Sequence, residues 1–268
     1  MNLALIGYGE VGQLFAREFV ANGAAVSVYD IKFDDPRARE PLAKTAAADR
    51  VRLASGPAAA IDGAEIVISA VTADQAVAAA RAAATHLRAG QSYVDLNSVS
   101  PRTKREAAEA VAPADFVEFA VMAPVAGLGL ASPILAGGAR AEALARRLNG
   151  LGMKIEAVSP AIGVASATKL CRSIVIKGLE AIMVDLNLAA ESAGVLTAVL
   201  HSLAATYPGM DWAEVARAMP KRVARHGLRR AAEMREAARM LEEMGVSGAF
   251  AEAIADRHEA YALETNKA

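Results

Sequence analysis

The chain has 268 residues, of which 54% are hydrophobic and 22% charged, and its net charge at pH 7 is −1. This composition is typical of a compact globular protein and excludes a disordered chain. Because no strong overall charge would attract nucleic acid or an anionic membrane surface, we expect neither as a partner. The single cysteine, Cys171, excludes an internal disulfide framework. Together with the absence of a signal-peptide pattern, it predicts a cytoplasmic protein.

Short sequence patterns test three special classes: membrane proteins, metal-binding proteins and hydrolases. Residues 119–139 carry no charge and are numerous enough to span a bilayer, but prolines and glycines interrupt them repeatedly, so no membrane helix is expected. The four histidines are scattered without ligand spacing, so no metal site is expected either. The chain lacks the Gly-x-Ser-x-Gly pattern that would indicate a hydrolase.

A glycine-rich motif directly follows the first predicted strand, residues 2–6, and leads into an amphipathic helix. The motif is Gly7-Tyr8-Gly9-Glu10-Val11-Gly12. Gly7 would permit a tight turn, Gly9 would let a pyrophosphate approach the backbone, and Gly12 would allow close packing of helix against strand. The pyrophosphate would then lie at the helix N-terminus, where amide groups and the helix dipole favour an anion. The motif therefore predicts a dinucleotide site.

The second predicted strand, residues 25–29, ends at Asp30. An acid at this position would accept hydrogen bonds from the adenosine ribose hydroxyls and repel a 2′-phosphate. This favours NAD as the cofactor, although Lys32 keeps NADP possible.

Strands and helices continue to alternate through the first half of the chain. Strands are predicted at 51–53, 65–70, 92–96, 115–121 and 153–158, and helices at 73–86, 100–111 and 140–148. Residues 36–50 are ambiguous and are interpreted as a loop with a helical piece. This alternation predicts an α/β fold with a Rossmann-type doubly wound sheet, forming a dinucleotide-binding domain over residues 1–158.

A long helix should join this domain to an all-helical one, residues 159–268. Ser159-Pro160 suits a helix start and Gly194 a helix end, which gives roughly 34 residues and about 50 Å. Further helices are predicted at 196–206, 212–219, 220–244 and 248–263. Because a helical half of this size cannot easily bury so long a helix alone, we expect a homodimer.

Charged residues on the helical half are candidates for a substrate site. Lys169, Ser173 and Lys177 are spaced i, i+4 and i+8, so they share one face of a mostly apolar helix. The basic segment 221–230 is more simply interpreted as a solvated face, and only His226 and Arg229 within it are kept as candidates.

Four segments together resemble the β-hydroxyacid dehydrogenase family, which includes 3-hydroxyisobutyrate dehydrogenase and is related to 6-phosphogluconate dehydrogenase. They are the glycine motif at 7–12, Asp95-Leu96-Asn97-Ser98-Val99-Ser100-Pro101, Ala123-Pro124-Val125-Ala126-Gly127, and the helix segment from Gly163 to Lys169. The stretch 222–234 resembles a subgroup described loosely as phosphogluconate-dehydrogenase-like oxidoreductases.

This resemblance implies roles for particular residues, with Lys169 as the catalytic lysine. It places substrate contacts at Asn97, Ser98, Val125, Ala126, Gly127 and Ser173, to which the positive charges of the helical half add Lys177 and Arg229. It places cofactor contacts at Gly7, Tyr8, Gly9, Glu10, Val11, Gly12, Asp30, Ala70, Val71, Thr72 and Asn97.

Several positions depart from the family pattern. Met122 replaces an acid, Ala126 a serine, Leu128 a glycine and Ser173 an asparagine. Because the cofactor loop and the lysine are retained while the substrate loop is altered, the resemblance supports the redox chemistry better than any named substrate.

The expected function is hydride transfer between NAD(P) and a small hydroxyacid or its oxo form, with an anionic substrate in a cleft between the domains and Lys169 as general acid and base. An ordinary lysine has a pKa of about 10.4, so base catalysis would require apolar burial or nearby positive charge to lower that pKa. The alternatives are reduction of an imine, decarboxylation of a phosphorylated hydroxyacid on the same scaffold, and a non-catalytic NAD-binding sensor.

Overall fold

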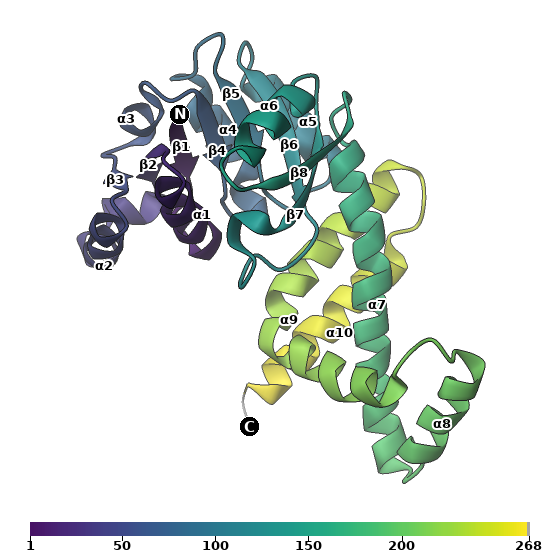
Figure 1. Ribbon diagram of the computed structural model, residues 1–268. Coiled ribbons are helices and arrows are strands. Elements are labelled where there is room, and N and C mark those ends of the chain that lie inside the picture. Colours follow the sequence, from purple (N-terminus) through teal and green to yellow (C-terminus); the bar gives the residue numbers. More distant parts are fainter. Residues whose placement is uncertain (267–268) are drawn as a thin grey trace. The chain divides into compact units, whose positions relative to one another are not determined.

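The computed structural model describes residues 1–266 and divides into two compact units, Met1–Lys169 and Leu170–Ala268 (Figure 1). The first unit contains the whole sheet, and the second is helical. The division falls inside the long helix, whereas the sequence places it after residue 158. The first turns of that helix therefore belong to the sheet unit.

The first unit is built on one eight-stranded sheet with the order β3-β2-β1-β4-β5-β6-β7-β8. All neighbouring strands are parallel except β6 and β7, which are antiparallel. The predicted α/β class is confirmed, with this one antiparallel pair as an addition. The strands are β1 (Asn2–Ile6), β2 (Ala25–Tyr29), β3 (Arg52–Leu53), β4 (Ile66–Ser69), β5 (Ser92–Asp95), β6 (Asp115–Val121), β7 (Pro133–Gly137) and β8 (Lys154–Ser159).

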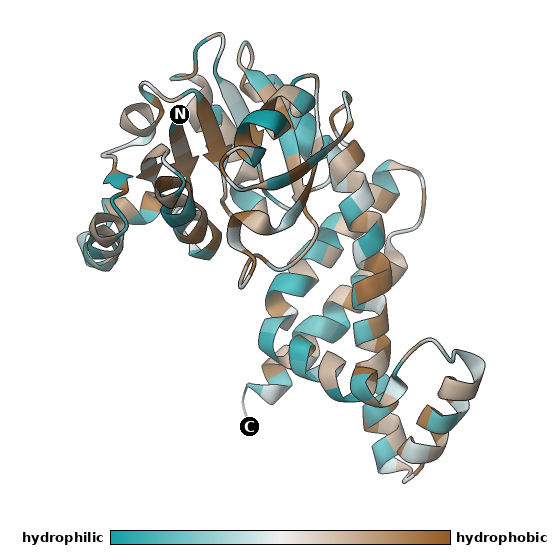
Figure 2. Ribbon diagram, viewed as in Figure 1, coloured by the Kyte–Doolittle hydropathy of each residue, from teal (hydrophilic) through white to brown (hydrophobic). Residues whose placement is uncertain are grey.

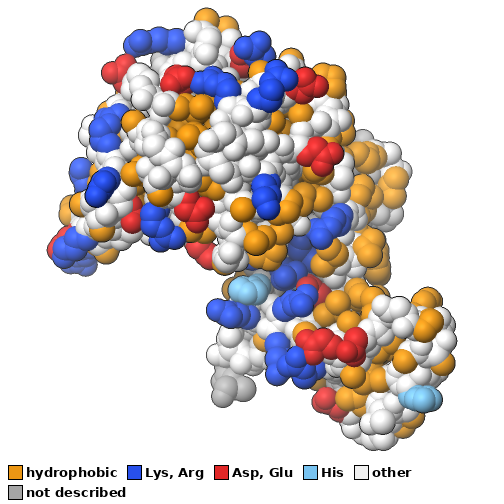
Figure 3. Space-filling view, in the orientation of Figure 1, with side chains coloured by type: hydrophobic (Ala, Val, Ile, Leu, Met, Phe, Trp, Pro, Cys, Tyr) orange, Lys and Arg blue, Asp and Glu red, His pale blue; other side chains and the backbone are white. Residues whose placement is uncertain are grey.

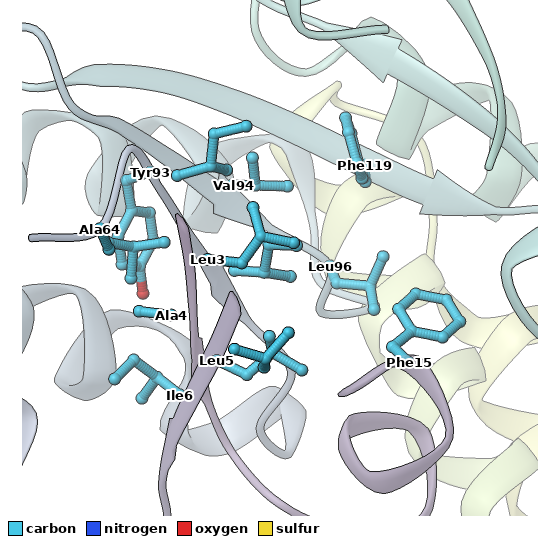
Figure 4. Close-up of a cluster of buried hydrophobic side chains, with 14 of the residues drawn as sticks. Leu3, Ala4, Leu5, Ile6, Phe15, Ala64, Tyr93, Val94, Leu96 and Phe119 are labelled. Carbon is cyan, nitrogen blue, oxygen red and sulfur yellow. The ribbon is translucent and has the colours of Figure 1, made fainter. Parts of the chain in front are cut away.

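The central strands are buried along their length because helices cover both faces of a doubly wound sheet. Figure 2 shows strongly hydrophobic strands around β1. In Figure 4, side chains of β1 such as Leu3 and Leu5 lie near Phe15 from α1 and Val94 from β5. The helices of this unit are α1 (Glu10–Ala21), α2 (Pro36–Ala48), α3 (Pro57–Ile61), α4 (Ala76–Ala84), α5 (Pro101–Ala110) and α6 (Ala141–Asn149), with short 3₁₀ turns η1 (Ile31–Asp34), η2 (Ala73–Gln75) and η3 (Gly129–Ala131).

The segment interpreted as a loop with a helical piece forms the regular helix α2. Asp35 caps it by accepting a hydrogen bond from the Arg37 amide at 2.9 Å, and Pro36 occupies the first turn. Both are standard helix-start features that the proline-rich composition obscured.

The second unit contains most of α7 (Val164–Ser192), then α8 (Leu196–Thr206), α9 (Trp212–Glu243) and α10 (Ala249–Thr265). α9 and α10 pack closely where Gly227 faces the backbone of His258. The contact requires glycine, because any side chain at position 227 would overlap the His258 carbonyl oxygen. Within residues 1–266, no helix combines the length and apolar character needed to cross a membrane.

The long helix begins later than predicted and has 29 residues. Ser159 does not cap it, because Ser159 ends β8 and its hydroxyl accepts a hydrogen bond from the Ala161 amide at 3.0 Å. Gly163, with a φ of +105°, then turns the chain into α7. The carboxylate that caps α7 comes from Glu118 on β6, which local sequence rules cannot reveal.

The predicted break at Pro220 does not occur, and residues 212–243 form the single helix α9. A proline removes the amide that would bond to the carbonyl four residues earlier, here that of Ala216. The Asn187 side chain from α7 donates to this carbonyl at 2.7 Å. Tertiary contact therefore satisfies the group that would otherwise end the helix.

Candidate active site

Three loops meet at the carboxyl edge of the sheet. They follow the adjacent parallel strands β1, β4 and β5 and contain residues 7–9, 70–72 and 96–98. From β1 the chain moves outward to β2 and β3, then returns to β4 on the other side of β1. This reversal is the topological switch point at which open α/β sheets bind ligands.

The glycine loop after β1 has the geometry that a pyrophosphate needs. Gly7 has a φ of +100°, and a side chain there would overlap the Ala70 carbonyl. A side chain at Gly12 would overlap the Gly7 carbonyl, so α1 lies directly against the loop. At Gly9, by contrast, an added Cβ would meet no atom of the described residues within 4 Å.

The start of α1 is equally suited to an anion. Among residues 1–266, no side chain caps its N-terminus. The amides around Glu10 and Val11 thus face the space that Gly9 leaves open. The loop residues present therefore fit a dinucleotide.

Asp30, at the end of β2, is held firmly beside the glycine loop. One carboxylate oxygen accepts the Tyr8 amide at 2.7 Å and the other the Lys32 amide at 2.9 Å. Because each carboxylate oxygen has two lone pairs, both can still accept a ribose hydroxyl. Lys32 makes this contact through its backbone amide, so the contact does not fix the position of the Lys32 ammonium group.

Tyr8 contributes to this region through its backbone. Its side chain is completely buried and packs edge-to-face on Phe33, with ring centroids 6.1 Å apart. Burial raises the pKa of the Tyr8 hydroxyl to about 12, with a smaller contribution from the negative charge of Asp49. The predicted cofactor contact of Tyr8 is thereby restricted to its main chain.

Asn97 ties two of the loops together. Its Oδ1 accepts the Val71 amide at 2.8 Å and its Nδ2 donates to Ser69 Oγ at 3.2 Å. Only 5% of Asn97 is exposed. The sequence assigns Asn97 to ligand contacts, whereas the structure uses its amide to fix the positions of Val71 and the neighbouring Ala70 and Thr72.

A buried ion pair beneath this loop was missed by sequence reasoning. Lys104 of α5 donates to the Asp95 carbonyl at 2.9 Å and to its carboxylate at 2.8 Å. The same carboxylate oxygen accepts the Asn97 amide at 2.8 Å. The signal was present in the spacing, because Lys104 lies between Pro101 and Ala107 on the buried face of α5.

Lys169 and Ser98, which the sequence assigns separately to a catalytic and a substrate-binding role, lie in contact. Lys169 Nζ donates a hydrogen bond to Ser98 Oγ, and both residues are half-buried. Ser98 lies one residue beyond Asn97 in the loop after β5, on the edge where the glycine loop lies. An amine and a hydroxyl in contact there can hold and transfer a proton.

The predicted substrate loop lies between β6 and η3. The Val125 carbonyl accepts the Gly129 amide at 2.8 Å, and Gly127 has a φ of +88°. Ala126 and Gly127 are exposed, while Val125 packs partly against the core. Glu18 of α1 anchors the loop by accepting the Leu130 amide at 2.7 Å, a contact that sequence reasoning missed.

The remaining predicted substrate residues belong to the second unit. Lys177 Nζ donates to Ser173 Oγ at 3.0 Å and to Glu233 at 2.6 Å, and all but 7% of the Lys177 side chain is buried. Arg229 is 68% exposed, with its guanidinium 3.8 Å from Glu233. Thus Ser173 and Lys177 meet, but Glu233 already balances the lysine charge.

Further buried ionisable residues adjoin Lys177. His258 contacts the Lys177 carbonyl at 3.0 Å, and Arg230 pairs with Glu180 at 2.6 Å. Burial raises the pKa of Glu180, and burial lowers that of His258 to about 4. This cluster lies on facing helices and gave no local sequence signal. Within residues 1–266, no three His, Cys, Asp or Glu side chains are grouped so that they could hold a metal ion.

Comparisons with known proteins agree with this geometry. A family model described as the NAD binding domain of 6-phosphogluconate dehydrogenase matches residues 2–161. A second, described as a domain of unknown function (DUF1932), matches residues 190–261. The cofactor is therefore a nicotinamide dinucleotide.

Two solved structures share substantial sequence identity with the chain. A conserved hypothetical protein from Sinorhizobium meliloti 1021 is 40% identical, with a TM-score of 0.84 and coverage of 98% of this chain and 89% of that one. A conserved protein of unknown function, described as structurally similar to 3-hydroxyacid dehydrogenases, is 32% identical, with a TM-score of 0.78 and 99% coverage of both chains.

More distant structures share the fold. The 3-hydroxyisobutyrate dehydrogenase of Mycobacterium tuberculosis is 19% identical, with a TM-score of 0.79 and coverage of 98% and 94%. A reductive aminase from Aspergillus terreus, in complex with NADPH and ethyl levulinate, is 20% identical, with a TM-score of 0.61 and coverage of 98% and 94%. The glycine loop, the lysine beside the β5 loop and the two matching domains lead to one conclusion: the chain belongs to the β-hydroxyacid dehydrogenase family of NAD(P)-dependent oxidoreductases.

Proposed function

We propose that the protein transfers a hydride between nicotinamide and a small hydroxyacid or its oxo form, with Lys169 as general acid and base. The observation that carries this proposal is the hydrogen bond from Lys169 Nζ to Ser98 Oγ. Ser98 follows β5, two strands from β1 in the sheet, so its loop shares an edge with the glycine loop. A dinucleotide bound at that edge supplies or accepts the hydride.

The chain's own residues would bind the cofactor and transfer the proton. The N-terminus of α1 and Asp30 would hold the pyrophosphate and the adenosine ribose. In the reduction direction, Lys169 in its ammonium form would give a proton to the substrate oxygen as the carbonyl becomes a hydroxyl. In the oxidation direction, the neutral amine would take that proton back. Ser98 would keep the amine in place and accept its hydrogen bond throughout.

A charge argument favours a carbonyl over an imine as the group reduced. Carbonyl reduction develops negative charge on oxygen, which the Lys169 ammonium stabilises. A protonated imine carries positive charge, and the same ammonium would repel it. Imine reduction therefore stays the second candidate, supported by the shared fold of the reductive aminase.

We further propose that the substrate is a small anion. The Lys169 ammonium beside Ser98 would attract a negatively charged substrate. On the second unit, Arg229 is exposed, and Figure 3 shows basic side chains on the surface of that unit. Lys177 is a weaker candidate for anion binding because Glu233 is already paired with it. Decarboxylation of a phosphorylated hydroxyacid would use the same charges.

The test is turnover of a panel of small oxoacids, aldehydes and cyclic imines with NADH and NADPH, in both directions. Lys169→Ala should leave NADH affinity within a few-fold and lower kcat by roughly 10²- to 10⁴-fold, because the cofactor loop does not use the lysine. Lys169→Arg should fail similarly, since a guanidinium stays protonated. Lys154→Ala, an exposed lysine of β8, is the matched control and should keep kcat.

Each contrary result selects another function. Tight NADH binding without turnover of any compound would support the non-catalytic sensor. Activity confined to cyclic imines would replace the hydroxyacid proposal by imine reduction, and loss of carbon dioxide from a phosphorylated substrate would support the decarboxylase.

A further inference from the structure

We infer that Glu118 is a positioning residue for the reaction: it fixes the start of α7 and, through that helix, holds Lys169 against Ser98. This inference rests on the proposed role of Lys169. Neither the glycine motif nor the substrate loop includes Glu118, which lies within the sheet, on β6.

The Glu118 carboxylate makes three contacts with the first turn of α7. Oε1 accepts the Gly163 amide at 2.6 Å and the Ala165 amide at 3.0 Å, while Oε2 accepts the Ser166 amide at 3.3 Å. These are amides that a helix start leaves without intrahelical partners. A carboxylate also interacts favourably with the positive end of the helix dipole. Glu118 therefore does from a strand what an N-cap residue does from within a helix.

The surrounding residues are shaped for this carboxylate. Glu118 is completely buried. It pairs in register with Gly137 on β7, where an added Cβ would lie 2.5 Å from Glu118 Oε1. Gly163, with its φ of +105°, brings its amide directly onto the carboxylate. Glycine at both positions thus makes room for the side chain and for the approach of the helix.

Glu118 also lies beside Asp95, the residue that supports the loop carrying Ser98. On β5 its register neighbour is Asp95, the residue that Lys104 clamps beneath the Ser98 loop. Two adjacent buried carboxylates in one row of the sheet thus fix two different segments. Asp95 fixes the loop that carries Ser98, and Glu118 fixes the helix that carries Lys169.

The link from Glu118 to Lys169 is short and regular. Lys169 follows Ser166 by three residues, so it lies on the next turn of α7. If the first turn loosens, the lysine amine is no longer held at Ser98 Oγ, and misplacement of a catalytic group by about 1 Å can cost roughly 100-fold in rate. Cofactor binding at the glycine loop does not involve α7 and should be unaffected.

Glu118→Gln tests this inference, because it keeps the size of the side chain but offers one acceptor oxygen in place of two. We expect kcat, normalised to the fraction of protein that binds NADH, to fall roughly 10- to 100-fold with the NADH dissociation constant unchanged. The solvent deuterium isotope effect on kcat should rise, because the slowed step is proton transfer. A merely destabilised protein would show neither change after normalisation.

Glu65→Gln is the matched control. Glu65 is also a carboxylate of the first unit that accepts a backbone amide, that of Asn2 at 3.0 Å, but it lies at the amino edge of the sheet. The Glu65→Gln variant should be less stable than the unmodified protein but should keep its normalised kcat. If Glu118→Gln does not accumulate as folded protein, Gly137→Ala takes its place, since the added methyl group crowds Oε1 while the charge remains.

A double-mutant cycle separates this inference from the proposed function. If Glu118 acts through Lys169, adding Glu118→Gln to Lys169→Ala should cause little further loss of kcat. Additive losses would overturn the positioning role, as would an unchanged normalised kcat in Glu118→Gln while Lys169→Ala is inactive. Full activity of Lys169→Ala would instead overturn the proposed function itself.

Discussion

The Lys104 ammonium and the Asp95 carboxylate form an ion pair at 2.8 Å, with 1% and 0% of their side chains exposed. Removing one partner of such a pair leaves a buried charge without compensation, which destabilises proteins more than loss of a surface pair. Because Asp95 also holds the amide of Asn97, the pair determines the shape of the loop that ends in Ser98.

Lys104→Met should therefore lower the free energy of unfolding by about 3–5 kcal/mol, measured by urea denaturation. Lys44→Met is the control, because Lys44 pairs with Glu40 at the surface, where both side chains are more than 70% exposed. Its cost should stay below about 1 kcal/mol. Replacing Asp95 by leucine in the Lys104→Met background should recover part of the loss. Equal costs for the two lysine variants would show that the buried pair contributes little.

The second prediction concerns cofactor choice at Asp30. We expect tighter binding of NADH than of NADPH, because the fixed carboxylate repels a 2′-phosphate. Asp30→Asn should narrow the difference, since the amide is uncharged and can still accept the Tyr8 amide. Fluorescence titration with each cofactor measures this difference in affinity. Asp34→Asn, at an exposed position, is the control. An unmodified protein that binds NADPH as well as NADH would contradict this preference.

The third prediction is a homodimer formed through the second unit. Val175 and Ile182 lie seven residues apart on one face of α7 and are 71% and 53% exposed. Phe250 of α10, 60% exposed, lies beside Gly178 and extends this apolar face. An exposed surface of this kind is typical of an interaction site.

Light scattering should accordingly give twice the chain mass of 27.7 kDa at micromolar concentration. Val175→Glu combined with Ile182→Glu should yield a monomer, whereas Val158→Glu, on β8 of the first unit, should leave the dimer intact. A monomeric unmodified protein with full turnover would refute the prediction.

The sequence predicts the first unit well because its signals are local. The roles of Gly7, Gly9 and Gly12, and the strands that follow them, depend on neighbours within a few residues. The start of α7 could not be predicted, because its cap comes from Glu118, 45 residues before Gly163. Pro220 was misinterpreted as a break for the same reason, since the group that compensates it is the side chain of Asn187.

Site residues divide in the same way. Family motifs mark Lys169 and Ser98 as candidates, and the structure places them in contact. Asn97 was assigned to ligands from a family motif and Lys177 from its spacing on the long helix, and the structure shows that their polar atoms also have partners within the fold. Lys104 was missed even though its position on the buried helix face was readable, because a lysine is usually assumed to be exposed.

The last prediction is that the second unit loses stability in mild acid through His258. Its Nε2 lies 3.0 Å from the Lys177 carbonyl, and since a carbonyl can only accept, Nε2 must carry the hydrogen. Protonation would then place a charge on Nδ1, which is buried and has no hydrogen-bond partner among residues 1–266. Burial, with the positive charges of Arg230 and Lys177 outweighing Glu233, lowers the pKa of His258 from 6.5 to about 4.

The sign of the effect follows from which state binds the proton. Below pH 6.5 the unfolded chain takes up a proton at His258, while the folded protein does not until about pH 4. The stability that neutral His258 contributes is complete above pH 6.5 and is lost progressively towards pH 4, by an amount on the order of 3 kcal/mol.

His258→Gln can keep a donor to the Lys177 carbonyl and cannot titrate. Urea denaturation between pH 7 and 4 should therefore show a shallower loss of stability for His258→Gln than for the unmodified protein, whereas His201→Gln, at an exposed site on α8, should retain the full slope. If all three proteins lost stability in parallel, the acid sensitivity would have to come from groups other than His258.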